Sequence, residues 1–224
     1  MNKLSSLLFL LFVVGKLHSQ ELKVDFSYKY MYANQWDKAI QTYNFSRPFL
    51  AEKQPLLMHG LNGSATYLFP SEKQLSHGIH LSYTYCRSAA ENENFSTTLN
   101  LHFINIGYVL HLAPTEKFTG FYSDLILSAT SSILHRRTNE VVLVDDETKL
   151  KALGIGGDLS LKVGFSLKLG VNSFLSPFVA VGYTPYFYSP ATEAVINQTK
   201  TLSSKNWTGI LTAQVGVAVC FRRR

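Results

Sequence analysis

Histidines, together with abundant serines and one strand aspartate, are the first candidates for chemistry in this sequence. A serine, a histidine and an acid in mutual contact can form a nucleophilic triad, and the chain offers His59, His80, His102, His111 and Asp124. Serine and threonine are so frequent that one of them near a histidine carries little information. A lone histidine in a strand is more often hydrogen-bonded to its neighbours as a structural residue. The pattern therefore predicts no catalytic residue and no enzyme.

Motifs for cofactors and metals give equally weak signals. The stretch LGIGGD at 153–158 is similar to a phosphate-binding loop, but it precedes a strand pattern instead of joining a strand to a helix. No spacing of Cys and His is typical of zinc. Asp145, Asp146 and Glu147 could attract calcium, although a solvated run of loop charges is the simpler interpretation. We expect no cofactor and no metal site.

Residues 34–55, NQWDKAIQTYNFSRPFLAEKQP, are the segment most suggestive of binding. They contain residue types that anchor protein interfaces, which predicts a partner-contact loop formed by Trp36, Tyr43, Phe45, Arg47 and Phe49. The alternative is that the loop folds over the end of the domain and buries its own aromatic side chains. The sequence favours this alternative, because so apolar a loop needs cover. The spacing of its apolar residues also allows a short helix.

The length and charge of the chain suit one domain without a nucleic-acid partner. Residues 1–19 join a positive start to the apolar run LLFLLFVV and a polar end, which predicts a secretory signal peptide and leaves 20–224 as the mature domain. The apolar run is too short to span a bilayer as a helix. The net charge of +6 is mild, and basic residues form no dense cluster of the kind that binds nucleic acid.

Apolar and polar residues alternate along most of the remaining chain. In GDLSLKVGFSLKLG at 157–170 the alternation predicts a strand with one apolar and one polar face. Between Phe103 and Ile104 the apolar face changes parity, which predicts a β-bulge. The same period predicts eight strands, at about 21–32, 57–69, 79–86, 97–112, 118–135, 157–170, 177–186 and 207–221.

The connections between these strands alternate in length. The expected long connections are 33–55, 88–96, 136–153 and 186–206, and the short ones are 70–77, 113–117 and 171–176. In an up-and-down meander every second connection lies on the same side, so the long ones share one end and the short ones share the other with both termini. This arrangement places Cys86 and Cys220 at opposite ends, too far apart for a disulfide. It also separates Asp124 from His59 and His102.

Two closed barrels fit an eight-stranded meander, a soluble lipocalin-like cup and a membrane barrel. The polar faces hold mostly Ser, Thr, Gly and Asn, and charged residues form only 16% of the chain, which is low for a surface in water. Aromatic residues gather near strand ends, where the two lipid–water interfaces would lie. The sequence therefore predicts an all-β fold: a closed up-and-down antiparallel transmembrane β-barrel of eight strands, with long extracellular loops and short periplasmic turns.

In these features residues 21–221 resemble the small outer-membrane barrels of the OmpA/OmpX-like class. The last strand, which ends on Phe221, is similar to the assembly signal of that class, from which the final three arginines depart. The resemblance implies a non-enzymatic protein of the bacterial outer membrane that contacts outer-membrane lipids. Its loops would serve structural support, adhesion or contact with another envelope protein. Two alternatives stay open, a lipid-A-modifying enzyme and a periplasmic lipocalin-like carrier. A conducting pore is not expected, because eight strands leave no aqueous channel.

Overall fold

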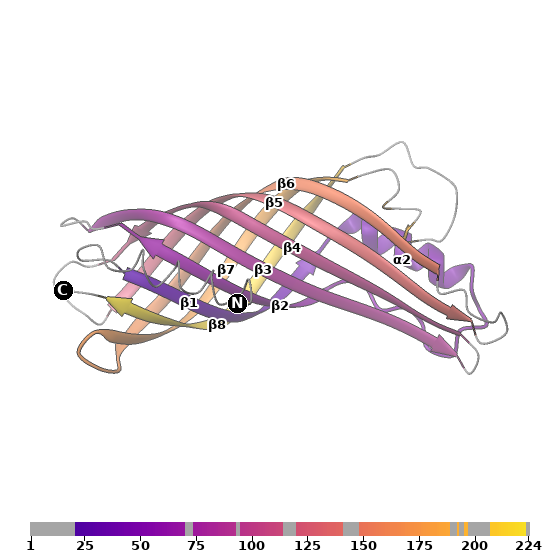
Figure 1. The fold of residues 1–224 in the computed structure, drawn as a ribbon, viewed down its shortest axis with the longest axis horizontal. Coiled ribbons are helices and arrows are strands. Elements are labelled where there is room, and N and C mark those ends of the chain that lie inside the picture. The colour runs from indigo at the N-terminus through magenta and orange to yellow at the C-terminus, as the bar shows by residue number, and fades with distance from the viewer. Residues whose placement is uncertain are drawn as a thin grey trace, which may run out of the picture.

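The chain forms a closed eight-stranded barrel in its computed structural model, which describes residues 21–69, 74–92, 95–113, 120–140, 148–188, 192, 195–196 and 207–222. Each strand pairs antiparallel with the next one along the chain, and β1 pairs with β8 (Figure 1). This confirms the predicted all-β, up-and-down barrel. The predicted signal peptide and the acidic run at 145–147 lie outside the described residues. The elements are β1 (Glu21–Tyr32), α2 (Asn34–Phe45), β2 (His59–Leu68), β3 (Leu75–Asn92), β4 (Phe95–Leu112), β5 (Gly120–Glu140), β6 (Thr148–Lys168), β7 (Ser173–Tyr188) and β8 (Trp207–Arg222).

The two ends of the barrel differ in what joins the strands. At the end called the turn end, β1 begins and β8 finishes, since Glu21 pairs with Arg222. Nε of Arg222 donates a hydrogen bond to the Glu21 carboxylate at 2.8 Å, which ties the first strand to the last. The short connections 69–74, 113–119 and 169–172 lie at this end. The opposite end, called the loop end, carries α2 (Figure 1).

Two of the four connections expected to be long are short. β3 and β4 stay paired out to Asn92 and Phe95, so only residues 93–94 separate them. β5 and β6 leave only residues 141–147 between them. The expectation of long loops at 88–96 and 136–153 is therefore wrong. Residues beyond the membrane can continue a strand, because pairing in the sheet still satisfies their backbone groups. Since both faces are polar there, apolar and polar residues do not alternate, and the sequence pattern does not indicate a strand.

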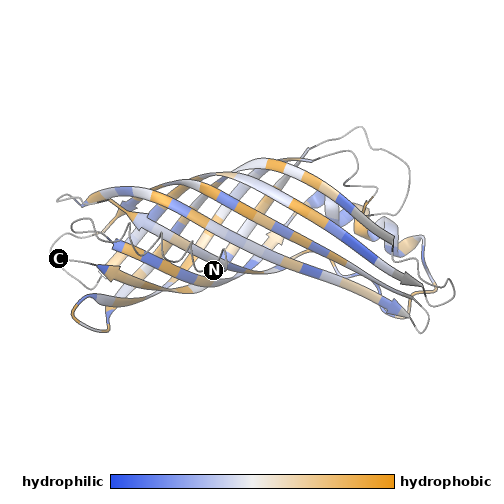
Figure 2. Cartoon of the chain, viewed as in Figure 1, coloured by the Kyte–Doolittle hydropathy of each residue, from blue (hydrophilic) through white to orange (hydrophobic). Residues whose placement is uncertain are grey.

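The outer surface of the barrel is apolar and its inner surface is largely polar. On β6, Leu159, Leu161 and Val163 are exposed, whereas Ser160 and Lys162 between them are buried. The same alternation runs along the other strands (Figure 2). A soluble cup has the inverse polarity, so these side chains contradict the lipocalin-like alternative. Large apolar side chains exposed on the other strands include Phe26, Leu61, Leu81, Ile106, Leu127, Val181 and Val215.

A charge in the middle of this apolar belt is expected to destabilise the barrel in a depth-dependent way. Leu161 lies near the centre of the apolar outer positions of β6, and Leu153 lies at their loop-end limit. We expect Leu161→Arg to lower the free energy of unfolding in lipid vesicles by about 2–4 kcal/mol, and Leu153→Arg by about 0–1 kcal/mol. Denaturant titration of the two variants measures this difference. Equal values would show that β6 does not cross a bilayer at this depth.

Polar side chains occupy much of the lumen between the turn end and the middle of the barrel, beside a small apolar cluster around Phe174 and Phe178. Lys162 Nζ lies 2.7 Å from the Asp25 carboxylate, which also accepts a hydrogen bond from Ser64 at 2.6 Å. Asp158 accepts a hydrogen bond from Thr184 at 2.6 Å. The cavity between Lys162 and its neighbours has a volume of about 20 Å³, which is room for about one water molecule. Lys162 and Asp25 are therefore a buried ion pair that joins two strands across the lumen.

The polarity of both barrel surfaces inverts near the loop end. Along β4, Ile104 and Ile106 face outward, but Leu101 and Phe103 face inward and are buried. The pairing of β4 with β3 runs from Leu75–Leu112 to Asn92–Phe95 without a break, and the pairing with β5 is equally continuous. The predicted β-bulge is therefore absent from this strand. The parity of the apolar residues shifts because the environment of the strand changes. Toward the loop end, its outer face lies beyond the apolar belt and its inner face contacts the apolar side of α2.

Candidate functional site at the barrel mouth

The helix α2 closes the loop end of the barrel. Trp36, Ile40 and Tyr43 repeat at i, i+4 and i+7 and are all buried, which places them on one face of the helix. The helix ends at Phe45, and Pro48 follows three residues later. A proline and the residue before it both disfavour helical backbone, so the chain leaves the helix here. Among the described residues, no helix is both long and apolar enough to cross a membrane.

Burial of the helix also affects its acidic residue. Asp37 lies in the first turn of α2 and is buried, and desolvation raises the pKa of its carboxyl above the ordinary value. A raised pKa means that the folded state holds the proton more tightly than the unfolded chain. Burying the ionised carboxylate therefore destabilises the folded state. This destabilisation is absent below the ordinary pKa of the carboxyl and fully present above the raised pKa.

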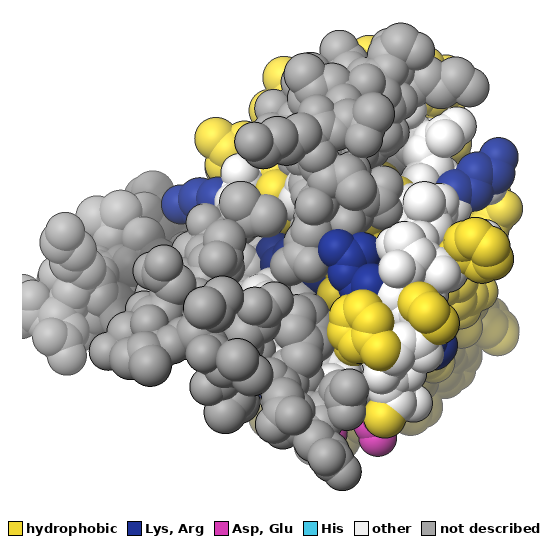
Figure 3. Space-filling model, turned by 90° about the vertical axis from the view of Figure 1, so that its right-hand side faces the viewer, with side chains coloured by type: hydrophobic (Ala, Val, Ile, Leu, Met, Phe, Trp, Pro, Cys, Tyr) yellow, Lys and Arg dark blue, Asp and Glu magenta, His cyan; other side chains and the backbone are white. Residues whose placement is uncertain are grey.

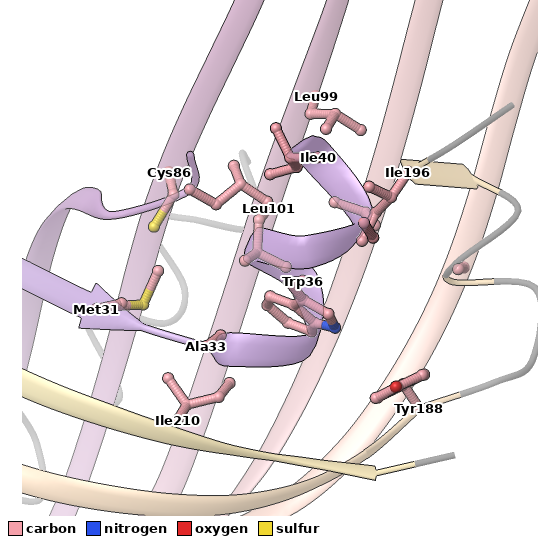
Figure 4. Packing of buried hydrophobic residues seen from close by; sticks show 14 of the residues in the cluster. Met31, Ala33, Trp36, Ile40, Cys86, Leu99, Leu101, Tyr188, Ile196 and Ile210 are labelled. Atoms are coloured by element: carbon pink, nitrogen blue, oxygen red, sulfur yellow. The ribbon is translucent and has the colours of Figure 1, made fainter. Parts of the chain in front are cut away.

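The apolar face of α2 packs into a cluster that lines the inner wall of the loop end. Trp36 stacks on Phe103 with 6.3 Å between ring centroids and meets the Tyr186 ring edge-on at 5.2 Å. Figure 4 shows Trp36 and Ile40 directed from the helix toward residues of several strands. This cluster explains the inward leucines of β4. Its other members include Met31, Cys86, Leu99, Leu101, Leu134, Tyr188, Ile196 and Ile210.

A single buried arginine links the barrel wall to the segments that close the mouth. Arg136 of β5 donates hydrogen bonds to the carbonyl oxygens of Val195 and Ile196, at 2.7 and 2.5 Å. It also donates to the side chains of Gln54 at 2.9 Å and Thr97 at 2.8 Å. Arg136 thus joins the first loop, the wall and residues 195–196. No sequence pattern singles it out from the arginine that follows it.

The five residues of the predicted partner-contact loop separate into two groups. Trp36 and Tyr43 are 1% and 0% exposed, so both lie inside the mouth. Arg47 lies over the Tyr43 ring, with its guanidinium carbon 4.1 Å from the centroid. Phe45 and Phe49 are 89% and 58% exposed. The loop therefore buries part of its aromatic surface and presents the rest, and the contact with a partner stays a prediction.

The histidines also fall into two groups. His80 and His111 are buried in the lumen, where His80 is hydrogen-bonded to Thr66 at 2.8 Å. His59 and His102 face outward and are hydrogen-bonded to tyrosines of the outer surface. The expectation that a strand histidine fills the lumen and is hydrogen-bonded to its neighbours fits His80 and His111, whereas His59 and His102 are hydrogen-bonded on the outer wall.

One histidine does meet an acid. His111 contacts the Asp124 carboxylate, and Lys23 Nζ lies 3.4 Å from the same carboxylate. The third member of this buried group is thus a lysine ammonium and not a serine hydroxyl, so the group has no nucleophile of the triad type. The sequence does not pair these residues, because the contact between Lys23 and Asp124 joins positions 101 residues apart.

The two cysteines occupy opposite halves of the barrel, as the topology predicts. Cys86 belongs to the cluster around α2, and Cys220 belongs to a second cluster with Phe174 and Phe178 near the turn end. Both are free and buried. They pack as small apolar residues.

The surface at the loop end combines apolar and basic side chains. The view onto this end shows hydrophobic side chains beside Lys and Arg side chains on the described surface, with acidic side chains scarce (Figure 3). An open hollow of about 590 Å³ lies on the outer wall near this end and is lined by Tyr85, Arg87, Asn100, His102, His135 and Arg137, among others. The loop end therefore carries two exposed features, the aromatic pair of the first loop and a basic outer wall.

Comparisons with known proteins give similar folds at low identity. No family model and no curated protein sequence matches the chain. The attachment invasion locus protein Ail of Yersinia pestis, solved with the heparin analogue sucrose octasulfate, is 10% identical, with 92% of this chain and 100% of that chain covered and a TM-score of 0.49. OprG of Pseudomonas aeruginosa is 10% identical, with 92% and 96% covered and a TM-score of 0.46. Neisserial surface protein A is 11% identical, with 91% and 97% covered and a TM-score of 0.42.

The fold conclusion depends on this chain's own geometry. Its strands form a closed meander in sequence order, its outer belt is apolar and its lumen is polar and filled. Outer-membrane barrels combine these three properties. The chain has the architecture of the small eight-stranded outer-membrane β-barrels of the OmpA/OmpX-like class.

Proposed function

We propose that this protein is a non-enzymatic outer-membrane barrel that acts as a rigid scaffold and presents its first loop to a partner outside the membrane. The observation that carries the proposal is the division of the loop aromatics. Trp36 and Tyr43 fix the loop in the mouth, and Phe45 and Phe49 stay exposed beside it. The partner is a surface for adhesion or another envelope protein.

The closed lumen supports a scaffold over a transport role. Paired charges occupy the middle of the barrel, where the cavity has room for about one water molecule. The apolar cluster around α2 occupies the loop end. Among the described residues, these two layers leave no continuous aqueous path. The lipid-A-modifying alternative receives no support from the His111–Asp124 contact, whose third member is Lys23.

The exposed pair has the properties of an interface anchor. Phe45 is the apolar member of a helix face whose other exposed residues, Lys38, Gln41 and Thr42, are polar. Phe49 follows four residues later, held near the helix by a loop that is itself tied down. Lys53 Nζ donates to the carbonyl oxygen of Arg47 at 3.0 Å. Because the loop is ordered before binding, less conformational entropy is lost on contact.

Photocrosslinking in intact cells tests this proposal. A photoreactive residue at Gln41, on the exposed face of α2, is expected to form an adduct with a second molecule. Replacing Phe45 and Phe49 together by serine is expected to lower the adduct yield about tenfold or more, since interface anchors contribute more than about 1 kcal/mol each.

The matched control is Glu52→Ser, an exposed polar position of the same loop, which is expected to leave the yield unchanged. Unchanged heat-dependent migration on a denaturing gel shows that each variant is folded. An adduct that is equally abundant in the Phe45 and Phe49 double variant would contradict the proposed contact. The absence of any adduct from the chain that keeps both phenylalanines and carries the photoreactive residue would also contradict it.

A further inference from the structure

The outer wall of β3–β6 changes chemistry abruptly at the loop-end limit of the apolar belt. On each of these four neighbouring strands, the first outward position beyond the last large apolar or aromatic residue is basic or an imidazole. The pairs are Tyr85 and Arg87 on β3, Ile104 and His102 on β4, Ile133 and His135 on β5, and Leu153 and Lys151 on β6.

Strand pairing brings these side chains together. Arg87 pairs with Asn100, Asn100 with His135, and His135 with Lys151, so Arg87, Asn100, His135 and Lys151 form one row across the sheet. On β4, His102 lies one outward position nearer the belt than Asn100. Arg137 lies at the next outward position of β5, about 7 Å farther along the strand. Arg87, Asn100 and His135 of the row, and Arg137, line the hollow on the outer wall.

Contacts among the side chains hold this surface in place. The rings of His102 and His135 meet edge-on, with centroids 5.8 Å apart, and the Tyr85 ring lies 5.1 Å from the His102 ring. Tyr83 is hydrogen-bonded to His102 at 2.7 Å, and the Tyr85 hydroxyl donates to Asn100 at 2.8 Å. The aromatic rings thus form a platform between the apolar belt and the basic row.

Among the described outward positions next to the belt on β3–β6, the charged side chains are all basic. Arg87, Arg137 and Lys151 are exposed, and among the described outward positions of β3–β6 the first acidic side chain beyond the belt is Glu91, two outward positions past Arg87. The corresponding outward positions of β1, β7 and β8 carry the aromatic residues Tyr32, Phe187 and Trp207, and that of β2 carries His59, so Arg and Lys occur at this height only on β3, β5 and β6 among the described strands. The basic surface therefore occupies one side of the barrel.

We infer that this surface binds the phosphate groups of lipids in the leaflet at the loop end. The inference rests on the membrane placement of the proposed function. A lipid whose acyl chains lie on the apolar belt places its headgroup at the height where the basic side chains begin. Arginine and lysine recognise phosphate by charge and hydrogen bonding, and basic residues next to a membrane-spanning segment attract anionic headgroups.

The test compares two lipids that differ only in phosphate. The purified full chain in neutral detergent is titrated with bis-phosphorylated lipid A and with its dephosphorylated form, and binding is followed by native mass spectrometry. The phosphorylated lipid is expected to bind at least tenfold more tightly. The triple variant Arg87→Gln, Arg137→Gln and Lys151→Gln is expected to lose about 100-fold in affinity for it, at roughly 1 kcal/mol for each basic residue.

Two control variants separate the basic row from total charge. Lys168→Gln removes an exposed lysine at the opposite end of β6 and is expected to leave the affinity unchanged. The Arg87→Lys and Arg137→Lys variant keeps the charge and is expected to retain most of the binding. Heat-dependent migration reports that each variant is folded, and recovery of the chain in the outer-membrane fraction distinguishes a failure of the membrane placement from a failure of the lipid site.

Two further arms identify the source of the phosphate. Inorganic phosphate at millimolar concentration is expected not to displace the lipid, because it lacks the acyl chains. Equal affinity for the two lipid A forms would overturn the inference. So would complete displacement of the lipid by a soluble heparin fragment that itself binds with the same affinity, since the surface would then be a polysaccharide site.

Discussion

Replacing Lys162 by methionine is expected to lower the free energy of unfolding by about 3–5 kcal/mol, because it leaves the Asp25 carboxylate buried without its cation. The two side chains are 7% and 1% exposed, and Nζ lies 2.7 Å from the carboxylate. Nζ also lies 4.4 Å from the centroid of the Phe178 ring. The ammonium is thus held between a charge and an aromatic face, and methionine replaces neither interaction.

Urea titration of the barrel in lipid vesicles, followed by tryptophan fluorescence, measures this loss. The control Lys168→Met removes an exposed lysine of the same strand and is expected to change stability by less than about 0.5 kcal/mol. Adding Asp25→Asn to Lys162→Met is expected to recover much of the loss, because the uncompensated charge disappears. A loss below about 1 kcal/mol for Lys162→Met would mean that the lumen is hydrated enough to screen Asp25.

Replacing Trp36 by alanine is expected to lower the free energy that holds α2 in the barrel mouth by about 3–5 kcal/mol, and so to loosen α2 selectively. The indole is 1% exposed and contacts the rings of Phe103, Tyr186 and Tyr188. Its removal leaves a cavity at the centre of the cluster that joins the helix to the barrel wall. The backbone of α2 approaches the strands at few points, so the local effect should exceed the effect on the sheet.

Hydrogen exchange separates the local effect from the global one. Amides of α2 are expected to exchange faster in Trp36→Ala, while amides at the centre of β4 and β5 stay protected. Gln41→Ala, on the exposed face of the same helix, is the matched control and should leave both rates unchanged. Uniformly faster exchange throughout the strands would show that α2 is part of the barrel's folding unit and not a separately docked plug.

Much of the architecture could be predicted because successive residues of a strand in a membrane barrel face lipid and the polar lumen in turn, and each environment selects its own residue types. In β6 the alternation of leucines with Ser160, Lys162 and Asp158 indicates both the strand and the face that meets lipid. The same two-residue period restricts the register between neighbouring strands, because a slip by one residue would turn the apolar side chains into the lumen. Strand period and strand count are local properties, which one sequence records.

The prediction of strand ends fails where the local rule changes. Above the apolar belt, Arg87, Asn100 and Arg137 remain in paired strands although their outer face lies in water. Leu101 and Phe103 remain in the same strand although their inner face meets a helix and not a polar lumen. The sequence shows this change as a shift of parity, for which a bulge is the local explanation. The position of α2 in the structure shows that the environment of β4 changes at this point, while the backbone pairing of the strand continues unbroken.

The sequence alone determined the strand period, the sidedness of the barrel and the aromatic first loop, because each depends on neighbouring residues. The tertiary structure alone decided which loop aromatics are exposed, which charges pair across the lumen and which basic side chains share the outer wall. Lys162 and Asp25 are 137 residues apart in sequence, and Arg87 and Lys151 come from strands separated by two others. Such contacts depend on the closure and shear of the whole barrel, which no local pattern encodes.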